Sequence, residues 1–532
     1  MKNSSLIYGL QRPNDKPDLI LVNSPIRDYT NEERQETEQL PAIGLGYIAT
    51  VCENAGFNVG LLDVEVNGLS PEKAATIINE SNPRWVGVNM LTPTYPLAKR
   101  IIANINKGIQ IEVGAAHSKA LSEKILKDLE IGHKIDLIVL EDGELISKGL
   151  LEGKNPSEMG GVAYIDKSSG QYTEQRRDPE GKWIPRDLDA LPFLNRKFFK
   201  NGIIKSEGRL EANIVGSRGC PFSCPFCAGA KEMLIFGVRQ RSVENIVQEI
   251  KTLKEQGVTA IRFIDDLFLS SPARVKQFFK LMTEAGLNEH VVWDATGRVN
   301  ILSKLDKETL ELMARSGARE ISIGVESGSQ RMLDLMNKGI KPEMVRNAIV
   351  NLASVGIRTK TYFMLGIPSE TEEEAKESVL FMHELRTLAR NTVAKNPLTP
   401  TGKQNEAQCR GSMFIFRPYP GTPFSEQLQG KKEWPKGTWK NSKQPLFTEE
   451  EILESFHPTT IKPGLEVRQK HSFSTTLQLG PLEPSKIQEM VDSAMLSQKE
   501  DMIIHGEYLP GVKEKKAENN GINKIGGQWR IA

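Results

Sequence analysis

Three of the five cysteines of this 532-residue chain lie within eight positions, and this group constrains the chain more than any other feature. Cys220, Cys224 and Cys227 are spaced Cys-x3-Cys-x2-Cys, with the aromatic Phe226 just before the last. Three thiolates can hold three irons of a 4Fe–4S cluster, where four would normally be expected. Because the other two cysteines are far away in sequence, we expect one iron to stay open for a substrate or cofactor.

Two other interpretations of the cysteines are open at this point. Structural zinc usually has four ligands in two pairs, and no second Cys or His pair with zinc-like spacing appears. A disulfide framework would need an even, dispersed set in a small secreted chain, whereas only Cys52 and Cys409 remain here. Spacing and context favour the iron–sulfur cluster.

The cysteine motif resembles the signature of the radical S-adenosylmethionine (SAM) enzymes. In that family the open iron chelates the amino and carboxylate groups of SAM, and one electron from the cluster cleaves SAM to methionine and a 5′-deoxyadenosyl radical. The resemblance therefore implies a 4Fe–4S cluster and SAM as cofactors. It also implies an electron donor such as flavodoxin.

Composition and charge exclude several classes of function. The 69 basic and 68 acidic residues nearly cancel, so nothing points to nucleic acid as a partner. The chain has no signal peptide pattern and no apolar run long enough to predict a transmembrane segment. Scarce cysteine and no secretory signal predict a cytoplasmic protein, in a reducing compartment that suits an oxygen-sensitive cluster.

Residues 1–150 alternate between strand and helix patterns. This alternation predicts an α/β domain with a doubly wound, Rossmann-like parallel sheet, in which ligands bind beyond the carboxyl ends of the strands. The predicted strands are 19–23, 59–63, 85–89, 110–113 and 136–140, and the predicted helices are 43–54, 71–79, 95–106 and 122–129.

Three loops at these strand ends resemble the cobalamin-binding domain that precedes many radical SAM barrels. The match is imperfect, because Gly-Ala-Ala-His at 114–117 and Glu-Asp-Gly-Glu at 141–144 stand where the family often has Gly-Gly-Pro-His and Gly-Glu-Gly-Glu. The resemblance implies cobalamin as a third cofactor. The residues implied to bind it are Thr92, Pro93, Thr94, Gly114, His117, Gly143 and Glu144.

The first strand is not followed by Asp-x-His-x-x-Gly, the motif that supplies a lower histidine ligand to cobalt in some cobalamin proteins. A bound cobalamin would then lack a protein histidine below the metal. The alternative is a degenerate domain that keeps the fold and binds nothing, since a fold alone does not establish a ligand. His117 could instead be an ordinary loop histidine.

Residues 151–207 have a looser pattern and are predicted to be a linker, after which strand–helix alternation returns over 208–429. Six strands in this order predict a partial (β/α)6 barrel of the TIM type, whose chemistry lies at the C-terminal ends of the strands. The predicted strands are 212–215, 260–264, 291–295, 320–324, 360–365 and 412–417, and the predicted helices are 243–256, 272–285, 307–316, 342–355 and 372–389.

Several residues at these strand ends are candidates for binding SAM. By resemblance, Glu326 and Ser327 would contact its methionine or ribose part. The stretch from Gly366 to Pro368 would let the backbone approach the adenine, since glycine permits close contact, and Phe226 would flank the same ring.

Other residues at the strand ends have two interpretations. Asp265 and Asp266 could belong to the cofactor site or could only cap a helix. Arg298 and Arg417 could pair with carboxylates of a cofactor or substrate, or could make structural ion pairs. Tyr419 could contact the substrate or pack in its turn. We assign Asp265 to the cofactor and the two arginines and Tyr419 to the substrate.

The remaining segments carry weaker signals. The polar insertion 391–410 is long enough to predict a lid or binding loop at the functional rim, and its Cys409 is expected to be a free thiol. Beyond residue 430, helical patterns at 449–456 and 484–497 predict a small helical region, and 513–527 is expected to be a mobile tail.

The resemblance covers roughly residues 15–430. It implies a cobalamin-dependent radical SAM enzyme that methylates an unactivated carbon, or phosphorus, centre of a small-molecule biosynthetic intermediate. In such enzymes the cofactors carry the hard steps and the protein positions them. The alternatives are a non-methylating radical cyclase, ring-contraction enzyme or dehydratase, and a protein that binds cluster and cobalamin without turnover. A methylthiotransferase is disfavoured, because it would need further N-terminal cysteines.

Overall fold

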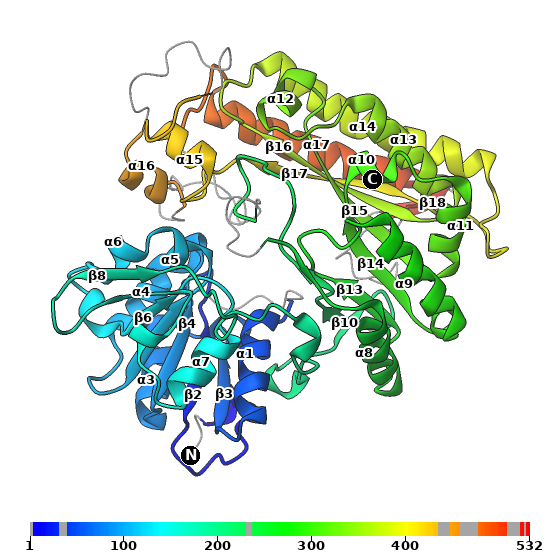
Figure 1. Ribbon diagram of the computed structural model, residues 1–532. Coiled ribbons are helices and arrows are strands. Elements are labelled where there is room, and N and C mark those ends of the chain that lie inside the picture. Colours follow the sequence, from blue (N-terminus) through cyan, green and yellow to red (C-terminus); the bar gives the residue numbers. More distant parts are fainter. Residues whose placement is uncertain are drawn as a thin grey trace.

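The computed structural model describes residues 4–30, 40–229, 237–434, 447–456 and 477–507, together with two short strands near the C-terminus. Figure 1 shows an N-terminal α/β unit in blue and cyan, next to a larger α/β unit in green and yellow. Within these ranges no helix is long and apolar enough to cross a membrane.

An eight-stranded sheet forms the N-terminal unit, in the order β1-β3-β2-β4-β5-β6-β7-β8. The five central strands are parallel, which confirms the predicted fold class, while β1, β7 and β8 add antiparallel edges. Strands β7 and β8 come from the segment predicted as a linker. The strands are β1 (Ile7–Tyr8), β2 (Leu19–Asn23), β3 (Val59–Asp63), β4 (Trp85–Asn89), β5 (Gln110–Gly114), β6 (Leu137–Val139), β7 (Val162–Ile165) and β8 (Tyr172–Gln175).

Helices cover both faces of this sheet, because successive residues of its strands point to opposite sides. Leu19 and Leu21 of β2 belong to a core with α1 and α7, whereas Ile20 and Val22 belong to a second core with α3, α4 and α6. The helices are α1 (Ile43–Asn54), α2 (Val64–Asn67), α3 (Pro71–Ser81), α4 (Tyr95–Ala103), α5 (Ala116–Ala120), α6 (Ser122–Leu126) and α7 (Glu144–Leu151).

The second unit is a curled seven-stranded sheet in the order β17-β16-β15-β14-β13-β10-β9. Its six parallel strands confirm the predicted partial barrel, and β9 adds an antiparallel edge. Its elements are β9 (Ile204–Ser206), β10 (Arg209–Ile214), β13 (Ala260–Phe263), β14 (Val292–Gly297), β15 (Ala318–Glu326), β16 (Arg358–Leu365), β17 (Cys409–Ile415), α8 (Val243–Glu255), α9 (Pro272–Glu284), α10 (Val299–Leu302), α11 (Lys307–Arg315), α12 (Gln330–Leu335), α13 (Pro342–Ser354) and α14 (Glu372–Lys395).

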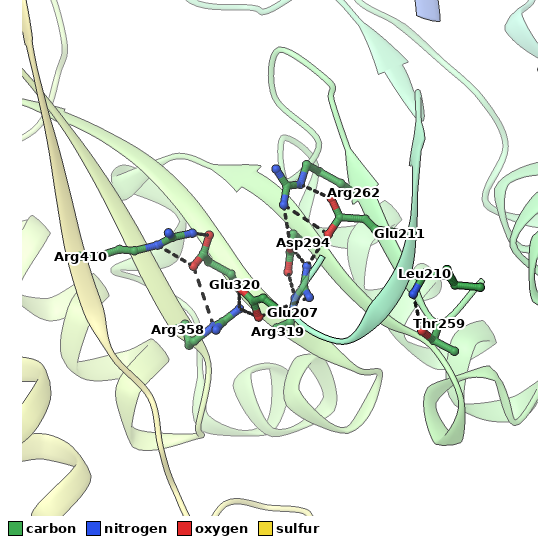
Figure 2. Close-up of polar contacts among 10 residues, drawn as sticks. All are labelled: Glu207, Leu210, Glu211, Thr259, Arg262, Asp294, Arg319, Glu320, Arg358 and Arg410. Carbon is green, nitrogen blue, oxygen red and sulfur yellow. Dashed lines mark hydrogen bonds and ion pairs between the residues drawn. The ribbon is translucent and has the colours of Figure 1, made fainter. Parts of the chain in front are cut away.

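Charged side chains gather near the N-terminal ends of the strands in this second sheet (Figure 2). Along β15, Ile321 and Ile323 belong to the apolar core, so Glu320 and Ser322 point to the other face. Each charged side chain in the network pairs with a side chain of opposite charge, which offsets the cost of burying it. The residues predicted to bind ligands lie at the opposite, C-terminal edge of the sheet. The members are Glu207, Glu211, Asp294, Glu320, Arg262, Arg319, Arg358 and Arg410.

The insertion 391–410 is not the predicted lid. Helix α14 continues to Lys395, and the rest of the insertion connects its end to the start of β17. There Asn405 Nδ2 donates to the carbonyl oxygens of Ala353 at 2.7 Å and Asn396 at 3.1 Å. The prediction was wrong because a helix-to-strand connection returns the chain to the N-terminal edge of the sheet, away from the site.

The C-terminal region covers the free edge of the second sheet. Gln498 of α17 accepts from the backbone N–H of Gly411 at 2.6 Å and donates to its carbonyl at 2.9 Å. Its side-chain amide thus replaces a neighbouring strand beside β17. Of the predicted tail, residues 513–521 and 526–527 lie outside the described residues, and residues 522–525 form a strand instead. The elements here are α15 (Pro423–Leu428), α16 (Glu449–Glu454), α17 (Pro484–Ile504), β18 (Ile522–Ile525) and β19 (Gln528–Ile531).

Candidate functional site

The three clustered cysteines lie in one loop at the C-terminal edge of the second sheet. The loop leaves β10 through a short hairpin of β11 (Ser217–Arg218) and β12 (Arg239–Gln240). Cys224 is buried, while Cys220 and Cys227 are half-buried. The Cys227 N–H donates to the Cys224 carbonyl at 3.1 Å, so the last two thiols share a tight turn.

Two neighbouring carboxyl groups hold the start of this loop. Asp265 accepts from the Gly216 N–H at 2.7 Å and from Ser217 Oγ at 2.6 Å, and burial raises its pKa to about 6. Asp266 accepts from the Gly219 N–H at 2.9 Å. Asp265 was predicted to bind a cofactor. Instead both of its oxygens are engaged at the start of the loop, because Asp265 lies two residues after the end of β13, beside Gly216 and Ser217.

Arg298 also contacts the cysteine loop. Its Nη1 donates to Cys224 Sγ at 3.8 Å, and its guanidinium carbon lies 3.5 Å from the centre of the Phe222 ring. Its Nη2 donates to the carbonyl of Lys338. These contacts differ from the predicted substrate role, because the side chain of Arg298 turns toward the loop.

The three thiols can hold an iron–sulfur cluster, because each thiolate of a 4Fe–4S cluster binds a different iron. In the part of the chain that the structure describes, no three His, Cys, Asp or Glu side chains converge where one metal ion could bind. Arg298 adds a positive charge beside the thiol of Cys224.

Glu326 and Ser327 diverge at the end of β15. Glu326 has a left-handed φ of +69°, a conformation that costs about 1–3 kcal/mol and often marks functional sites. Its Oε1 accepts from Lys338 Nζ at 2.5 Å, and that amine lies 5.8 Å from the centre of the Phe226 ring. Ser327 is fully buried and hydrogen-bonded to Ser378 Oγ at 2.9 Å, so only Glu326 joins Phe226 beside the cysteine loop.

The Gly366 turn is closed by the C-terminal helix. Gly366 has a φ of +81°, and a Cβ there would lie 2.8 Å from Ile487 Cδ1 of α17. Its N–H donates to Glu370 Oε2 at 2.5 Å, and burial raises the pKa of that carboxyl to about 8. Pro368 is buried in the same turn. The close approach that the glycine permits is therefore to α17 in this structure.

Arg417 and Tyr419 come together beside α16. The Arg417 guanidinium lies 5.5 Å from the centre of the Phe456 ring, and the Tyr419 ring lies 5.0 Å from it. Burial lowers the pKa of Arg417 to about 10. The structure thus places both predicted substrate residues at the C-terminal edge of the sheet, after β17.

A second site is a cavity of about 590 Å³ at the C-terminal edge of the first sheet. Helix α1, the ends of β2, β4, β5 and β6, and three residues of the second unit line it, so it lies between the two units. Of the predicted cobalamin residues, those that line it are Gly114, Gly143 and Glu144, and those that do not are Thr92, Pro93, Thr94 and His117.

His117 lies behind this cavity. It is buried, its Nδ1 lies 3.2 Å from Thr92 Oγ1, and its ring lies 4.4 Å from that of Tyr95. Thr94 Oγ1 accepts from the Leu91 N–H at 3.0 Å. Thr92, Thr94 and Tyr95 belong to the β4–α4 connection and the start of α4, and His117 of α5 packs against them. The prediction that His117 contacts the cofactor is therefore not supported by its position.

Glycine at position 87 keeps the floor of the cavity open. Gly87 is in the middle of β4, in register with Leu21 and Glu112. A Cβ there would lie 2.7 Å from Leu21 Cδ2 and 2.9 Å from Glu112 Oε1. The hollow is concave and mostly apolar with a few polar groups, as is typical of cofactor sites. It can admit one part of a large cofactor such as cobalamin.

Arg218 connects the two sites, although it was not among the predicted site residues. It lines the cavity and lies two residues before Cys220. Its guanidinium pairs with Asp142 at 2.9 Å and Glu144 at 2.6 Å. Burial opposes ionisation of Asp142, but Arg218 and Arg239 lower its pKa overall. The loop predicted to bind cobalamin is thus ion-paired to the hairpin that carries the cysteines.

The fold and the two sites define an enzyme that brings an open iron–sulfur cluster next to a corrinoid cavity. The model for the radical SAM superfamily matches residues 214–382 of this chain, and the model for the B12 binding domain matches residues 37–151. These two matched domains define a cobalamin-dependent radical SAM enzyme, whose cofactors are a 4Fe–4S cluster, SAM and cobalamin.

Curated relatives and solved structures resemble both units. The chain is 29% identical to an uncharacterised methyltransferase of Pyrococcus horikoshii, covering 65% of this chain and 73% of that protein. It is 26% identical to cytidylyl-2-hydroxyethylphosphonate methyltransferase of Streptomyces wedmorensis, over 70% and 78%. The structure of the radical SAM methyltransferase TsrM from Kitasatospora setae, with cobalamin and a [4Fe–4S] cluster, superposes with a TM-score of 0.61, at 16% identity over 95% and 93%.

Proposed function

We propose that this enzyme transfers a methyl group to an unactivated carbon, or phosphorus, centre of a small molecule. Arg218 carries the proposal, because one side chain both lines the cobalamin cavity and precedes the cysteine loop. Cofactors at the two sites would therefore face one shared space. Both relatives described above are named methyltransferases.

The cluster with SAM supplies one-electron chemistry when bound, and cobalamin supplies the methyl group. The chain's own residues hold and orient these groups. Cys220, Cys224 and Cys227 would bind the irons, and Asp265 and Asp266 fix their loop. Positioning of this kind is what the protein contributes in cofactor enzymes.

Substrate and electrons would reach the site by different means. Arg417 and Tyr419, at the C-terminal edge after β17, would contact the substrate, since a guanidinium pairs well with a carboxylate or phosphate. An external one-electron donor such as flavodoxin would reduce the cluster.

Anaerobic reconstitution with iron, sulfide, cobalamin, reductant and SAM tests the proposal. Candidate metabolites are screened for a gain of one methyl group, and 5′-deoxyadenosine is measured in parallel. Cys224→Ala should lose the cluster absorbance and SAM cleavage. Cys409→Ala is the matched control, because Cys409 is buried at the far end of β17 and should keep both. Cleavage that survives in Cys224→Ala would remove the cluster from the reaction.

A radical cyclase is the second candidate. It is favoured by 27% identity to the anaerobic magnesium-protoporphyrin IX monomethyl ester cyclase of Cereibacter sphaeroides, over 64% of this chain and 55% of that protein. SAM labelled in its methyl group separates the two. A product that carries the label supports methylation, whereas an unlabelled product with a new ring supports the cyclase.

A further inference from the structure

The inner face of the partial barrel is the face of the second sheet that is turned away from its helices. On β16, Phe363 and Leu365 belong to the apolar core with residues of α13 and α14. Successive residues of a strand point to opposite faces, so Lys360, Tyr362 and Met364 point to the inner face. All three are half-buried, so their side chains are partly accessible to a ligand.

Lys360 is a cation without a carboxylate of its own. The charged network on its N-terminal side (Figure 2) contains four carboxylates and four arginines, so its charges balance without Lys360. Glu320, on the neighbouring strand, already pairs with Arg410 at 2.7 Å. Among the described residues no carboxylate pairs with Lys360, and its ammonium instead lies 5.0 Å from the centre of the Tyr362 ring.

Two serine hydroxyls lie beside this lysine. Ser322 of β15 is in register with Lys360, and Ser412 of β17 is in register with Tyr362. Both serines are half-buried on the inner face, and within the described part of the chain neither hydroxyl has a hydrogen-bond partner. An ammonium and two hydroxyls are donors suited to a carboxylate or a phosphate. Together they form an anion subsite that still lacks its acceptor.

Aromatic side chains lie on the C-terminal side of this subsite. Phe414 of β17 is 52% exposed, which is unusual for a large apolar side chain inside a barrel. Its ring centre lies 6.0 Å from that of Tyr362. Aromatic rings bury large apolar areas and stack on flat groups. The subsite therefore fits a ligand whose anionic group is attached to a flat or apolar body.

Both cofactor sites border this inner face. Gly324 is in register with Tyr362, and a Cβ at Gly324 would lie 2.7 Å from Lys338 Nζ, beside the candidate SAM residues. In the other direction along the sheet, Ile264 lines the cavity between the two units. Neighbouring strands lie about 4.8 Å apart, so Lys360 is about 14 Å from Ile264 along the sheet. A small molecule anchored at Lys360 can thus extend toward both cofactors.

We propose that Lys360, with Ser322 and Ser412, binds an anionic group of the substrate, a carboxylate or a phosphate. Tyr362 and Phe414 hold the flat or apolar body to which this group is attached. Lys360 is then a specificity-determining residue that selects anionic small molecules. The inference rests on the proposed function, because the ligand is the molecule that receives the methyl group. No bond is made or broken at the subsite.

Three small probes test the subsite. Phenyl phosphate and benzoate carry an anionic group on a flat ring, and benzyl alcohol is their neutral counterpart. Their dissociation constants are measured anaerobically by calorimetry with the reconstituted full chain. The wild type should bind at least one anion about tenfold more tightly than benzyl alcohol. Tighter binding of phenyl phosphate indicates a phosphorylated substrate, and tighter binding of benzoate indicates a carboxylic acid.

Three variants assign the selectivity to one side chain. Lys360→Met should weaken the tighter anion by about tenfold or more and leave benzyl alcohol unchanged, which also shows that the variant is folded. Lys360→Arg keeps the charge and should bind the anion within about threefold of wild type. Lys251→Met is the matched control, because Lys251 is exposed on α8 and its loss removes the same charge from the chain.

A second readout locates the ligand. The tighter anion, at saturation, should slow the acetylation of Lys360, measured by peptide mass spectrometry, and leave that of Lys251 unchanged. The inference is overturned if no anion binds the wild type more tightly than benzyl alcohol, if Lys360→Met leaves the anion affinity unchanged or weakens all three probes equally, or if Lys360 is not protected. These measurements need no turnover. An unlabelled product in the labelled-SAM experiment would refute methyl transfer and leave this subsite in place.

Discussion

Replacing Arg298 with glutamine should make the iron–sulfur cluster harder to reduce. Reduction adds one negative charge to the cluster, and Arg298 is a cation whose Nη1 donates to Cys224 Sγ at 3.8 Å. A positive charge and a hydrogen bond at the sulfur both favour the reduced form. The substitution keeps a polar side chain of similar length and removes the charge.

The size of the shift follows from the geometry. A hydrogen bond to a charged group contributes about 1.5–3 kcal/mol, and 3.8 Å is long even for a bond to sulfur. We therefore take about 1 kcal/mol as the difference between the two oxidation states. For a one-electron couple, about 1.4 kcal/mol corresponds to 59 mV, so the reduction potential should fall by about 40 mV.

Redox titration of the reconstituted cluster, followed by electron paramagnetic resonance, measures this potential. Arg298→Lys keeps the charge but loses the planar contact with Phe222, so we expect a shift smaller than that of the glutamine variant. Arg331→Gln is the control, because Arg331 pairs with Glu374 on an exposed surface and should leave the potential unchanged. A potential in Arg298→Gln that equals or exceeds the wild-type value would refute the reasoning.

Three further outcomes are expected. The pKa of Glu370 is about 8 in the folded chain and lower in the unfolded chain, so the stability of the wild type should fall as pH rises from about 4.5 to about 8. In Glu370→Gln the urea unfolding midpoint should fall less over this pH range. If the midpoints of the two proteins fall in parallel with pH, the prediction is wrong. Lys338→Met leaves the buried Glu326 carboxylate without its amine partner and should lower the free energy of unfolding by about 3–5 kcal/mol. The double variant Lys338→Met/Glu326→Gln should recover most of this loss. If urea unfolding shows that Lys338→Met is as stable as the wild type, the ion pair does not stabilise the fold. Arg218→Ala should speed limited proteolysis between residues 151 and 207 and weaken cobalamin retention, whereas an unchanged digestion pattern would mean that the pairs with Asp142 and Glu144 do not hold the units together.

Much of the fold could be predicted because its signals are local. A parallel strand covered on both faces is a short, continuous apolar run, and 19–23, 59–63 and 85–89 have the same bounds in the structure. The cysteine motif is equally local. Strands β7 and β8 were missed because each is only four residues long, and β8 lies at the sheet edge and is only half-buried.

The roles of single polar residues could not be predicted, because they depend on partners distant in sequence. Asp265 serves Gly216 and Ser217, and Arg218 pairs with Glu144, which is 74 residues away. Ser327 and His117 stand at the expected strand ends, but their side chains point into the surrounding structure.

Arg218 also has a thermodynamic consequence. The side chain belongs to the wall of one cofactor cavity and to the hairpin that carries the other cofactor's ligands. If one occupied site holds this side chain in the position that the other site needs, the coupling free energy favours both sites by the same amount, because coupling between binding sites is reciprocal. Cluster assembly and corrinoid uptake then form a linked equilibrium, in which the loss of either cofactor lowers the retention of its neighbour.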